Sequence, residues 1–434
     1  MAKKQAKREK KQFKEFRATA PEEFIVEEIT SDGAVLEAGR EQNLGKPEDA
    51  SLERNYFTHF ILEKRNWNTM QVLNEIARRA GVNPKRFEFA GTKDRNALTT
   101  QLCSAFAMEP ARLLAAARSV KDARVLGAWK ARGKARLGDL VGNRFTITLT
   151  KQNCGVEPDA REIADRASAT NFRITNYFGA QRFGSMRANS HLVGALLLKG
   201  DFEGAVWNYL VYTDEREGDK SAVKARERLA KERRKKKPDF AKALEYYPGF
   251  LKYERELLKH LSVQPRDFSG ALSRLPRHLQ LMFVHAFQSA LFNQTLEERV
   301  KKKKLFKAKA GDECCGKNAF GFPDVDVLKK VEKKQVEKVS GELASGNAFL
   351  VGKVIGSDSE LTAAEKKMLK KAGLTQDGFK FKTMPWLSCR GGKRALAVPL
   401  KNFQVLSENP AALRFELPAG SYATVAIKEL LEKA

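Results

Sequence analysis

The stretch AGTKDRNALTTQ, residues 90–101, is the most informative part of this chain. Phe87 and Phe89 alternate with a polar residue just before it, which is typical of a strand, and Gly91 favours a turn. Asp94 is therefore predicted on a loop at a strand end, where a rigid scaffold can present a carboxylate to a ligand. The same charged run is also compatible with an ordinary surface turn.

Alternating and apolar runs elsewhere predict further short strands around this loop. Such runs lie at residues 24–26, 60–62, 145–149 and 413–417. Residues 69–80 have helical spacing, with Thr69 as the predicted N-cap and Gly81 at the C-terminal end. A dense apolar pattern over 279–300 predicts a long buried helix, and Ser421 is the predicted cap of a last helix.

The charge of the chain is strongly positive. A formal net charge of +27 and a pI of about 9.8 indicate a polyanionic partner, because Lys and Arg release counterions when they bind a phosphate backbone. A high surface charge, or adaptation to heat or salt, would explain the same numbers. Residues 1–17 are predicted to form a flexible basic arm; the alternative is an amphipathic helix that packs through Phe13 and Phe16. Basic runs at 231–237 and 301–304 are either phosphate contacts or solvated surface.

Several classes of protein and site are disfavoured by the sequence. No apolar run reaches the length that crosses a bilayer, so a soluble, cytoplasmic protein is expected. Five scattered cysteines and five histidines lack the spacing of a disulfide framework or a metal site, so no metal is predicted. GDECCGKN, residues 311–318, has phosphate-loop spacing, but Asn318 stands where Ser or Thr should bind magnesium; no nucleotide cofactor is predicted.

Four motifs follow one another along the chain: Gly91-x-Lys93-Asp94-x-x-Ala97-x-Thr99-x-Gln101, Leu137-Gly138 with GNRF at 142–145, NYFGAQRFG at 176–184, and LPAGSYAT at 417–424. Weaker matches are PEEF at 21–24, HAFQSALFN at 285–293 and GGKR at 391–394. With these motifs the chain resembles the TruD family of tRNA pseudouridine synthases. The run SHLVG at 190–194 is similar to the archaeal members.

The resemblance implies an α+β fold with two interleaved domains. A catalytic pseudouridine synthase domain, residues 18–175 plus 400–434, would contain a mixed, mostly antiparallel sheet. A large α/β inserted TRUD domain, residues 176–399, would split it. The sequence by itself shows only shifts of composition near Asn176 and Pro399.

The resemblance also implies a reaction, the isomerisation of uridine to pseudouridine in tRNA, at position 13. Asp94 would be the catalytic nucleophile or base, and Phe145 would stack on the flipped target base. The other expected substrate contacts are Lys93, Gln101, Asn143, Arg182, Asn293 and Arg17, the last also being a candidate cation partner of Asp94. The reaction is redox neutral, so no external cofactor is expected, and a monomer is expected.

Three points stay open at this level. Asp94 could attack the substrate covalently or remove a ribose proton. For Phe145, the alternation of its strand favours a core position, whereas the resemblance favours base contact. A non-catalytic RNA-binding or RNA-chaperone protein on the same fold is the alternative function, and a metal-dependent nuclease is disfavoured because no acidic ligand cluster is evident.

Overall fold

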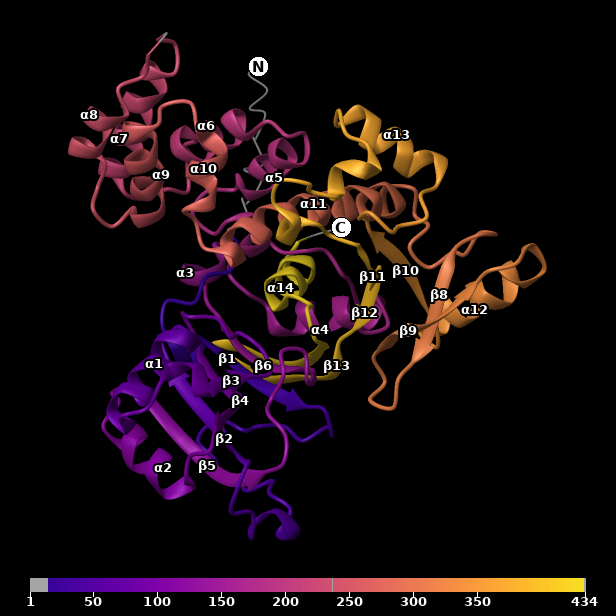
Figure 1. Ribbon diagram of the computed structural model, residues 1–434. Coiled ribbons are helices and arrows are strands. Elements are labelled where there is room, and N and C mark those ends of the chain that lie inside the picture. Colours follow the sequence, from indigo (N-terminus) through magenta and orange to yellow (C-terminus); the bar gives the residue numbers. More distant parts are fainter. Residues whose placement is uncertain (1–14, 236, 433–434) are drawn as a thin grey trace, which may run out of the picture.

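The computed structural model describes residues 15–235 and 237–432. Its largest element is an eight-stranded sheet with the order β13-β14-β6-β1-β4-β2-β5, in which the short β3 pairs with β4 (Figure 1). Only the β1–β4 pair is parallel, so the sheet is mixed and mostly antiparallel, as predicted. The strands are β1 (Phe24–Thr30), β2 (Phe57–Arg65), β3 (Phe87–Phe89), β4 (Leu98–Phe106), β5 (Ala123–Ala131), β6 (Leu140–Leu149), β13 (Lys401–Glu408) and β14 (Ala411–Pro418).

Two pairs of helices cover one face of this sheet. The pair α1 (Thr69–Ala80) and α2 (Pro110–Arg118) packs on apolar residues of β2 and β4, such as Phe60. The pair α4 (Ala160–Ala169) and α14 (Ala423–Leu431) packs on apolar residues of β6 and β14, such as Phe145. The core of the sheet is therefore divided into two parts.

Between these two apolar parts the same face is polar. Directly paired residues point to the same side of a sheet, and the register pairs Val26 with both Phe145 and Thr99. Extending this register along the strands places five buried or partly buried polar side chains on that face: Glu28, Lys64, Thr99, Gln101 and Asn143, here called the polar strip. Burying so many polar groups costs free energy unless they are paired or used by a ligand.

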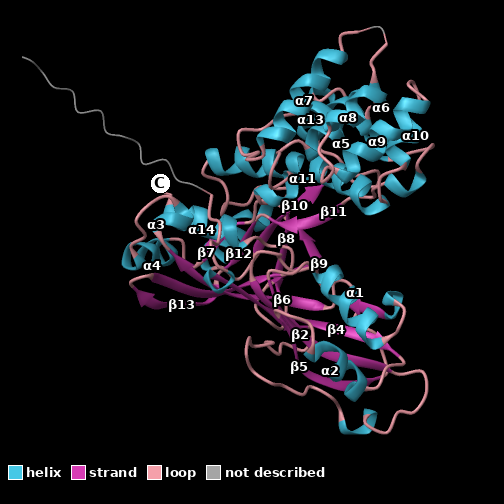
Figure 2. Ribbon diagram, turned by 90° about the vertical axis from the view of Figure 1, so that its left-hand side faces the viewer, coloured by secondary structure: helices cyan, strands magenta, loops and turns pink. Residues whose placement is uncertain are grey.

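The chain leaves and re-enters this part of the molecule at a two-stranded sheet, where β7 (Arg173–Thr175) pairs with β12 (Ala397–Pro399). The intervening residues form a group of helices and a four-stranded sheet with the order β11-β10-β8-β9. Figure 2 shows most of these helices gathered at one end of the molecule and the eight-stranded sheet at the other.

The bounds of these intervening elements complete the fold. The helices are α5 (Ser190–Leu198), α6 (Phe202–Val211), α7 (Lys220–Glu232), α8 (Phe240–Tyr246), α9 (Lys252–Val263), α10 (Phe268–Ser273), α11 (Arg277–Lys301), α12 (Val336–Ser345) and α13 (Ala363–Lys371). The strands are β8 (Glu313–Lys317), β9 (Pro323–Lys330), β10 (Phe349–Val354) and β11 (Gly392–Ala395). The predicted long helix is confirmed as α11, and the stretch with phosphate-loop spacing forms β8, with no phosphate loop.

Two predicted helix caps are wrong by one residue. The N-cap of α1 is Asn68, which accepts a hydrogen bond from the Met70 amide, while Thr69 is buried as the first helical residue. The N-cap of α14 is Tyr422, and Ser421 instead donates to Asn176 Oδ1 at 3.0 Å. In both cases a tertiary hydrogen bond occupies the hydroxyl that local sequence would assign to the cap, because Thr69 donates to a side chain of β4.

The end of the predicted basic arm is docked on the sheet. Phe16 is buried and packs edge-on against Phe24, with ring centroids 5.7 Å apart. The backbone amide of Arg17 donates to the Asn153 carbonyl at 2.9 Å. The rest of the predicted arm, including Phe13, lies outside the described residues. Among the described residues, no helix is both long and apolar enough to cross a membrane.

Candidate active site

Asp94 lies where the sequence predicts it, on the loop between β3 and β4. The loop is held from two sides. Lys64 Nζ, from β2, donates to the backbone carbonyl of Asp94 at 2.7 Å. Gln181 Nε2 donates to Asp94 Oδ1 at 3.2 Å, and Gln181 belongs to the 3-10 turn Ala180–Phe183 that follows β7. The carboxylate thus sits between the large sheet and the segment that leads into the helices.

The surroundings of Asp94 make its carboxylate unusually basic. Burial raises the pKa of Asp94, while the hydrogen bond from Gln181 and the charges of Lys64 and Lys93 act in the opposite direction. Burial also lowers the pKa of Lys64 to about 8. A partly exposed carboxylate with a raised pKa and two cations nearby is suited to act as a base or a nucleophile.

Lys93 is predicted from sequence as a substrate contact, and the structure places it inside the protein. Its Nζ lies 2.5 Å from Glu28 Oε2, and both side chains are almost completely buried. Glu28 Oε1 also accepts a hydrogen bond from the Leu102 amide at 3.0 Å. The ion pair therefore fastens the Asp94 loop to β1.

Gln101 and Asn293, also predicted as substrate contacts, support the backbone in the same way. Gln101 is buried; its Nε2 donates to the Gly91 carbonyl at 3.0 Å and its Oε1 accepts from Thr69 at 2.9 Å. Asn293, on α11, bonds both the amide and the carbonyl of Phe178 at 2.9 Å. One side chain shapes the Asp94 loop and the other shapes the segment that carries Gln181.

Asn143 leaves hydrogen-bonding capacity free on the polar strip. Its Oδ1 atom is buried and has no hydrogen-bond partner among the described residues, and the same holds for Thr99 Oγ1. Asn143 is paired in register with Glu28, which holds Lys93 and through it the Asp94 loop. Buried polar atoms without partners cost free energy, and this cost is offset when a ligand supplies the missing bonds.

Phe145 is placed in the core. Its ring is 5% exposed and lies 6.0 Å from the ring of Phe24, nearly parallel to it, and 5.8 Å from the ring of Phe415. This arrangement is the one that the alternation of its strand favours, and it offers no open aromatic face to a base.

Neither of the two predicted arginines makes a described contact with Asp94. Arg182 follows Gln181, its guanidinium lies 5.4 Å from the ring centroid of Phe178, and its buried Nε has no hydrogen-bond partner among the described residues. Arg17 is exposed and donates to the Ser185 carbonyl at 3.3 Å, with no described contact to Asp94.

Sequence reasoning missed Lys64 and Gln181 as neighbours of Asp94. Each left a signal. Lys64 is two residues from Leu62 and shares its apolar, inward face of β2, where a lysine is rarely buried without a role. Gln181 stands beside Arg182 within the motif at 176–184.

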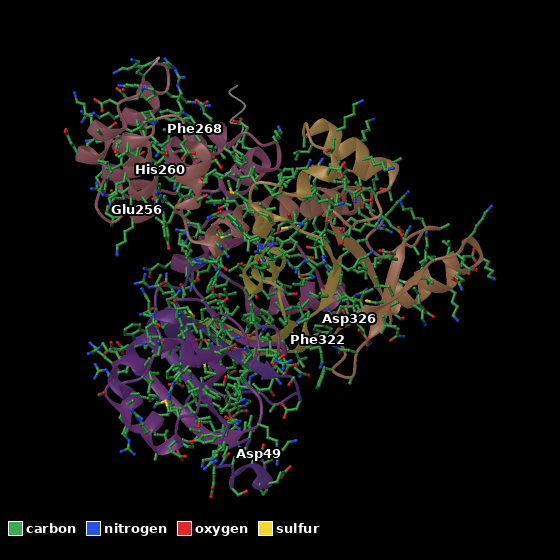
Figure 3. The ribbon with its side chains drawn as sticks, in the orientation of Figure 1. Asp49, Glu256, His260, Phe268, Phe322 and Asp326 are labelled. Carbon is green, nitrogen blue, oxygen red and sulfur yellow. The ribbon has the colours of Figure 1, made fainter. Side chains whose placement is uncertain are left out.

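The remaining polar groups include candidate metal ligands and the two basic runs. Among the described residues, no group of three or more His, Cys, Asp or Glu side chains could hold a metal ion. His260, for example, bonds Asp267 at 2.8 Å within the helical group, at the opposite end of the molecule from Asp49 (Figure 3). In the two basic runs, exposed Lys235 pairs with Glu232 at the end of α7, and exposed Lys301 pairs with Glu297 of its own helix, α11.

Comparison with known proteins identifies related chains. The model of the family tRNA pseudouridine synthase D (TruD) matches residues 14–430. Proteins that carry the name tRNA pseudouridine synthase D are similar in Methanosarcina acetivorans (33% identical, covering 95% of this chain and 91% of the relative) and Thermococcus sibiricus (34% identical, covering 86% and 88%). A crystal structure under the same name from Methanosarcina mazei superposes with a TM-score of 0.68 at 32% identity, covering 95% of this chain and 92% of that one.

Proposed function

The chain belongs to the TruD family of tRNA pseudouridine synthases, and on that premise we propose that it isomerises uridine in tRNA, at position 13, with Asp94 as the catalytic carboxylate. The observation that supports this proposal best is the setting of Asp94. Its carboxylate is partly exposed at the junction of two parts of the molecule, bears a raised pKa, and lies within the field of the charges of Lys64 and Lys93.

The reaction needs no redox partner. The bond between uracil N1 and ribose C1′ breaks, the base rotates, C5 bonds to C1′, the C5 proton leaves and N1 takes up a proton. A carboxylate can assist in two ways: it can attack the substrate covalently, or it can remove a ribose proton and later help to release the C5 proton. Raised basicity of Asp94 favours either route, and Lys64 and Lys93 stabilise its ionised form.

Binding of the base requires partners next to Asp94. A uridine within folded RNA must be extruded before its glycosidic bond can be reached. In this proposal the unpartnered Oδ1 of Asn143 and Oγ1 of Thr99 supply hydrogen bonds to the extruded nucleotide. Phe145 contacts the base only after its packing between Phe24 and Phe415 loosens, which makes it the weakest of the proposed contacts.

The two parts of the chain have different proposed roles. We assign catalysis to residues 18–175 plus 400–434, which contain the eight-stranded sheet and Asp94, and treat residues 176–399 as an inserted domain that contributes Gln181 and Arg182 to the site. The positive charge of the chain then holds the tRNA backbone across both parts.

The decisive experiment is release of tritium from tRNA that carries [5-³H]uridine, measured with the wild-type protein and with Asp94→Asn and without added metal. Release by wild type alone supports the synthase and its carboxylate together. Equal release by Asp94→Asn, correctly folded, would remove Asp94 from the mechanism. Tight binding of tRNA without release by wild type would favour the RNA-binding alternative.

A further inference from the structure

A cavity of about 410 Å³ lies beside the turn that carries Gln181. Its walls come from that turn, from the middle of α11, from the end of β10 and from the glycine-rich segment that precedes β11. Arg182, His285 and Arg390 line it, together with the hydroxyl of Ser289 and the backbone of Gly391 and Gly392, and no lining residue is acidic. The lining is therefore electropositive, with Arg390 also 3.9 Å from Asp358 Oδ2 and the Ser289 hydroxyl donating to the His285 carbonyl at 2.8 Å.

Arg182, which lines the cavity, and Arg394, which lies behind it, share the ring of Phe178. Arg394 lies 4.2 Å from the ring centroid of Phe178, the same ring that Arg182 approaches at 5.4 Å. Arg394 donates to the carbonyl and the side-chain oxygen of Asn176 and to the Gly420 carbonyl, which are all uncharged, and neither arginine has an ion-pair partner among the described residues. Phe178 itself lines the cavity.

Burial and charge repulsion lower the pKa values of two basic groups around this cavity. Burial, and to a smaller extent repulsion by Arg182, lowers the pKa of Arg394 to about 10. Burial and the Arg182 charge also lower the pKa of His285. Arg182 Nε is buried and has no hydrogen-bond partner among the described residues. An anion in the cavity would relieve the repulsion and give this donor a partner.

We propose that this cavity, here called the phosphate pocket, binds one phosphodiester of the tRNA backbone close to the target uridine. Planar guanidinium groups bind phosphate oxygens in pairs, and hydroxyl and backbone N–H groups complete such sites. The pocket is coupled to the reacting site because Arg182 directly follows Gln181, whose side chain bonds Asp94. This inference rests on the proposed function and adds to it the element that fixes the register of the RNA on the enzyme.

The first test is the salt dependence of tRNA binding by Arg182→Gln. Loss of one phosphate contact should weaken binding about tenfold at low salt and reduce the slope of log affinity against log salt by about one. Arg182→Lys should keep most of the slope, because it keeps the charge. Arg266→Gln is the matched control, since Arg266 is exposed in the helical group and has no described ion pair. Equal losses in Arg182→Gln and Arg266→Gln would overturn the proposal.

The second test locates the phosphate. In tRNA substrates that each carry one uncharged methylphosphonate near the target uridine, one linkage should weaken binding to wild type and have no effect on binding to Arg182→Gln. If every linkage affects both proteins equally, the phosphate pocket is wrong. Thermal unfolding of each variant confirms that the fold is intact.

Failure of this inference differs from failure of the proposed function. If wild type releases tritium but no methylphosphonate linkage affects binding differently in wild type and Arg182→Gln, the proposed reaction is supported and the phosphate pocket is rejected. If wild type binds tRNA without releasing tritium, the reaction fails, while the coupling between Arg182 and one linkage is still measured in binding.

Discussion

Arg187, Arg226, Glu217 and Glu254 form a buried cluster in the helical group, whereas Glu28, Lys64, Lys93 and Asp94 form another at the large sheet; we call these the helical cluster and the loop cluster. Each contains two acids and two bases. In the helical cluster, Arg187 and Arg226 both lie 2.9 Å from Glu254 Oε1, and Arg226 lies 3.1 Å from Glu217. In the loop cluster only Glu28 and Lys93 are paired.

The unpaired half of the loop cluster is where the chemistry is proposed. Lys64 bonds the backbone of Asp94, and the described hydrogen bond to the Asp94 carboxylate comes from Gln181, a neutral donor. Burial lowers the pKa of Arg226, but Glu254 and Glu217 more than offset this. For Asp94, burial prevails and raises the pKa. Two acids and two bases therefore form a fully ion-paired cluster in the helical group, whereas at the large sheet one carboxylate, that of Asp94, has no ion pair among the described residues and is the group to which we assign the chemistry.

The largest expected effect is on activity, from Asp94→Asn. Turnover should fall by about 10³-fold or more, because the general base or nucleophile is lost. Stability should not fall at pH 7. The folded pKa of Asp94 is raised, so its ionised form costs stability above that pKa, and asparagine removes the cost; any gain in Tm should shrink as pH falls toward the unfolded value. Tritium release and thermal unfolding between pH 4 and pH 8 measure both. A large loss of Tm at pH 7 would show that the Asp94 carboxylate stabilises the fold, like the carboxylates of the helical cluster.

The second effect is on stability, from Glu254→Gln. Removing the carboxylate leaves two buried guanidinium groups with one acid and should lower the free energy of unfolding by about 3–5 kcal/mol, while the folded fraction keeps its turnover. The matched control is Glu256→Gln, two residues away on the same helix (Figure 3), whose exposed pair with Lys259 is worth less than about 1 kcal/mol. Denaturant unfolding of both variants gives the difference. Similar losses would mean that ion pairing in the helical cluster does not stabilise the fold more than an exposed pair does.

A smaller effect concerns the pH profile and Lys64. Lys64→Met should move the acid limb of kcat/KM to higher pH, because a cation that favours ionised Asp94 is removed. In the wild type, activity should fall as pH rises through about 8, where Lys64 loses its proton. Lys64→Arg should move this alkaline limb upward, since guanidinium does not titrate there. Identical profiles for all three proteins would show that Lys64 acts only through its bond to the loop backbone.

The smallest effect separates packing from base contact at Phe145. Phe145→Leu should lower the free energy of unfolding by about 1–2 kcal/mol, and Phe415→Leu, in the same stack of rings, by a similar amount. A packing role leaves kcat/KM nearly equal in the two variants. A selective loss of kcat/KM in Phe145→Leu would restore the base contact that the family resemblance implies.

Local sequence was sufficient for the strands near Asp94, the loop itself and the long helix α11. Alternation and turn residues fix these features within a few positions of the chain. The polar strip could not be read in this way. Glu28, Thr99 and Asn143 belong to three strands, and only the order and register of the sheet make them neighbours. The helix caps failed for a related reason, because tertiary partners occupied the hydroxyls of Thr69 and Ser421.

The sequence by itself placed Asp94 on a loop at a strand end, showed the basic character of the chain and, through its motifs, indicated the family. Only the tertiary structure decided that Lys64 bonds the Asp94 backbone while Arg17 bonds Ser185, that Lys93 pairs with Glu28, and that Gln181 bonds Asp94 across 87 positions of sequence. The physical reason is that short-range backbone preferences act between neighbours in the chain, whereas burial, ion pairing and hydrogen bonding depend on which side chains the folded sheet and helices bring together.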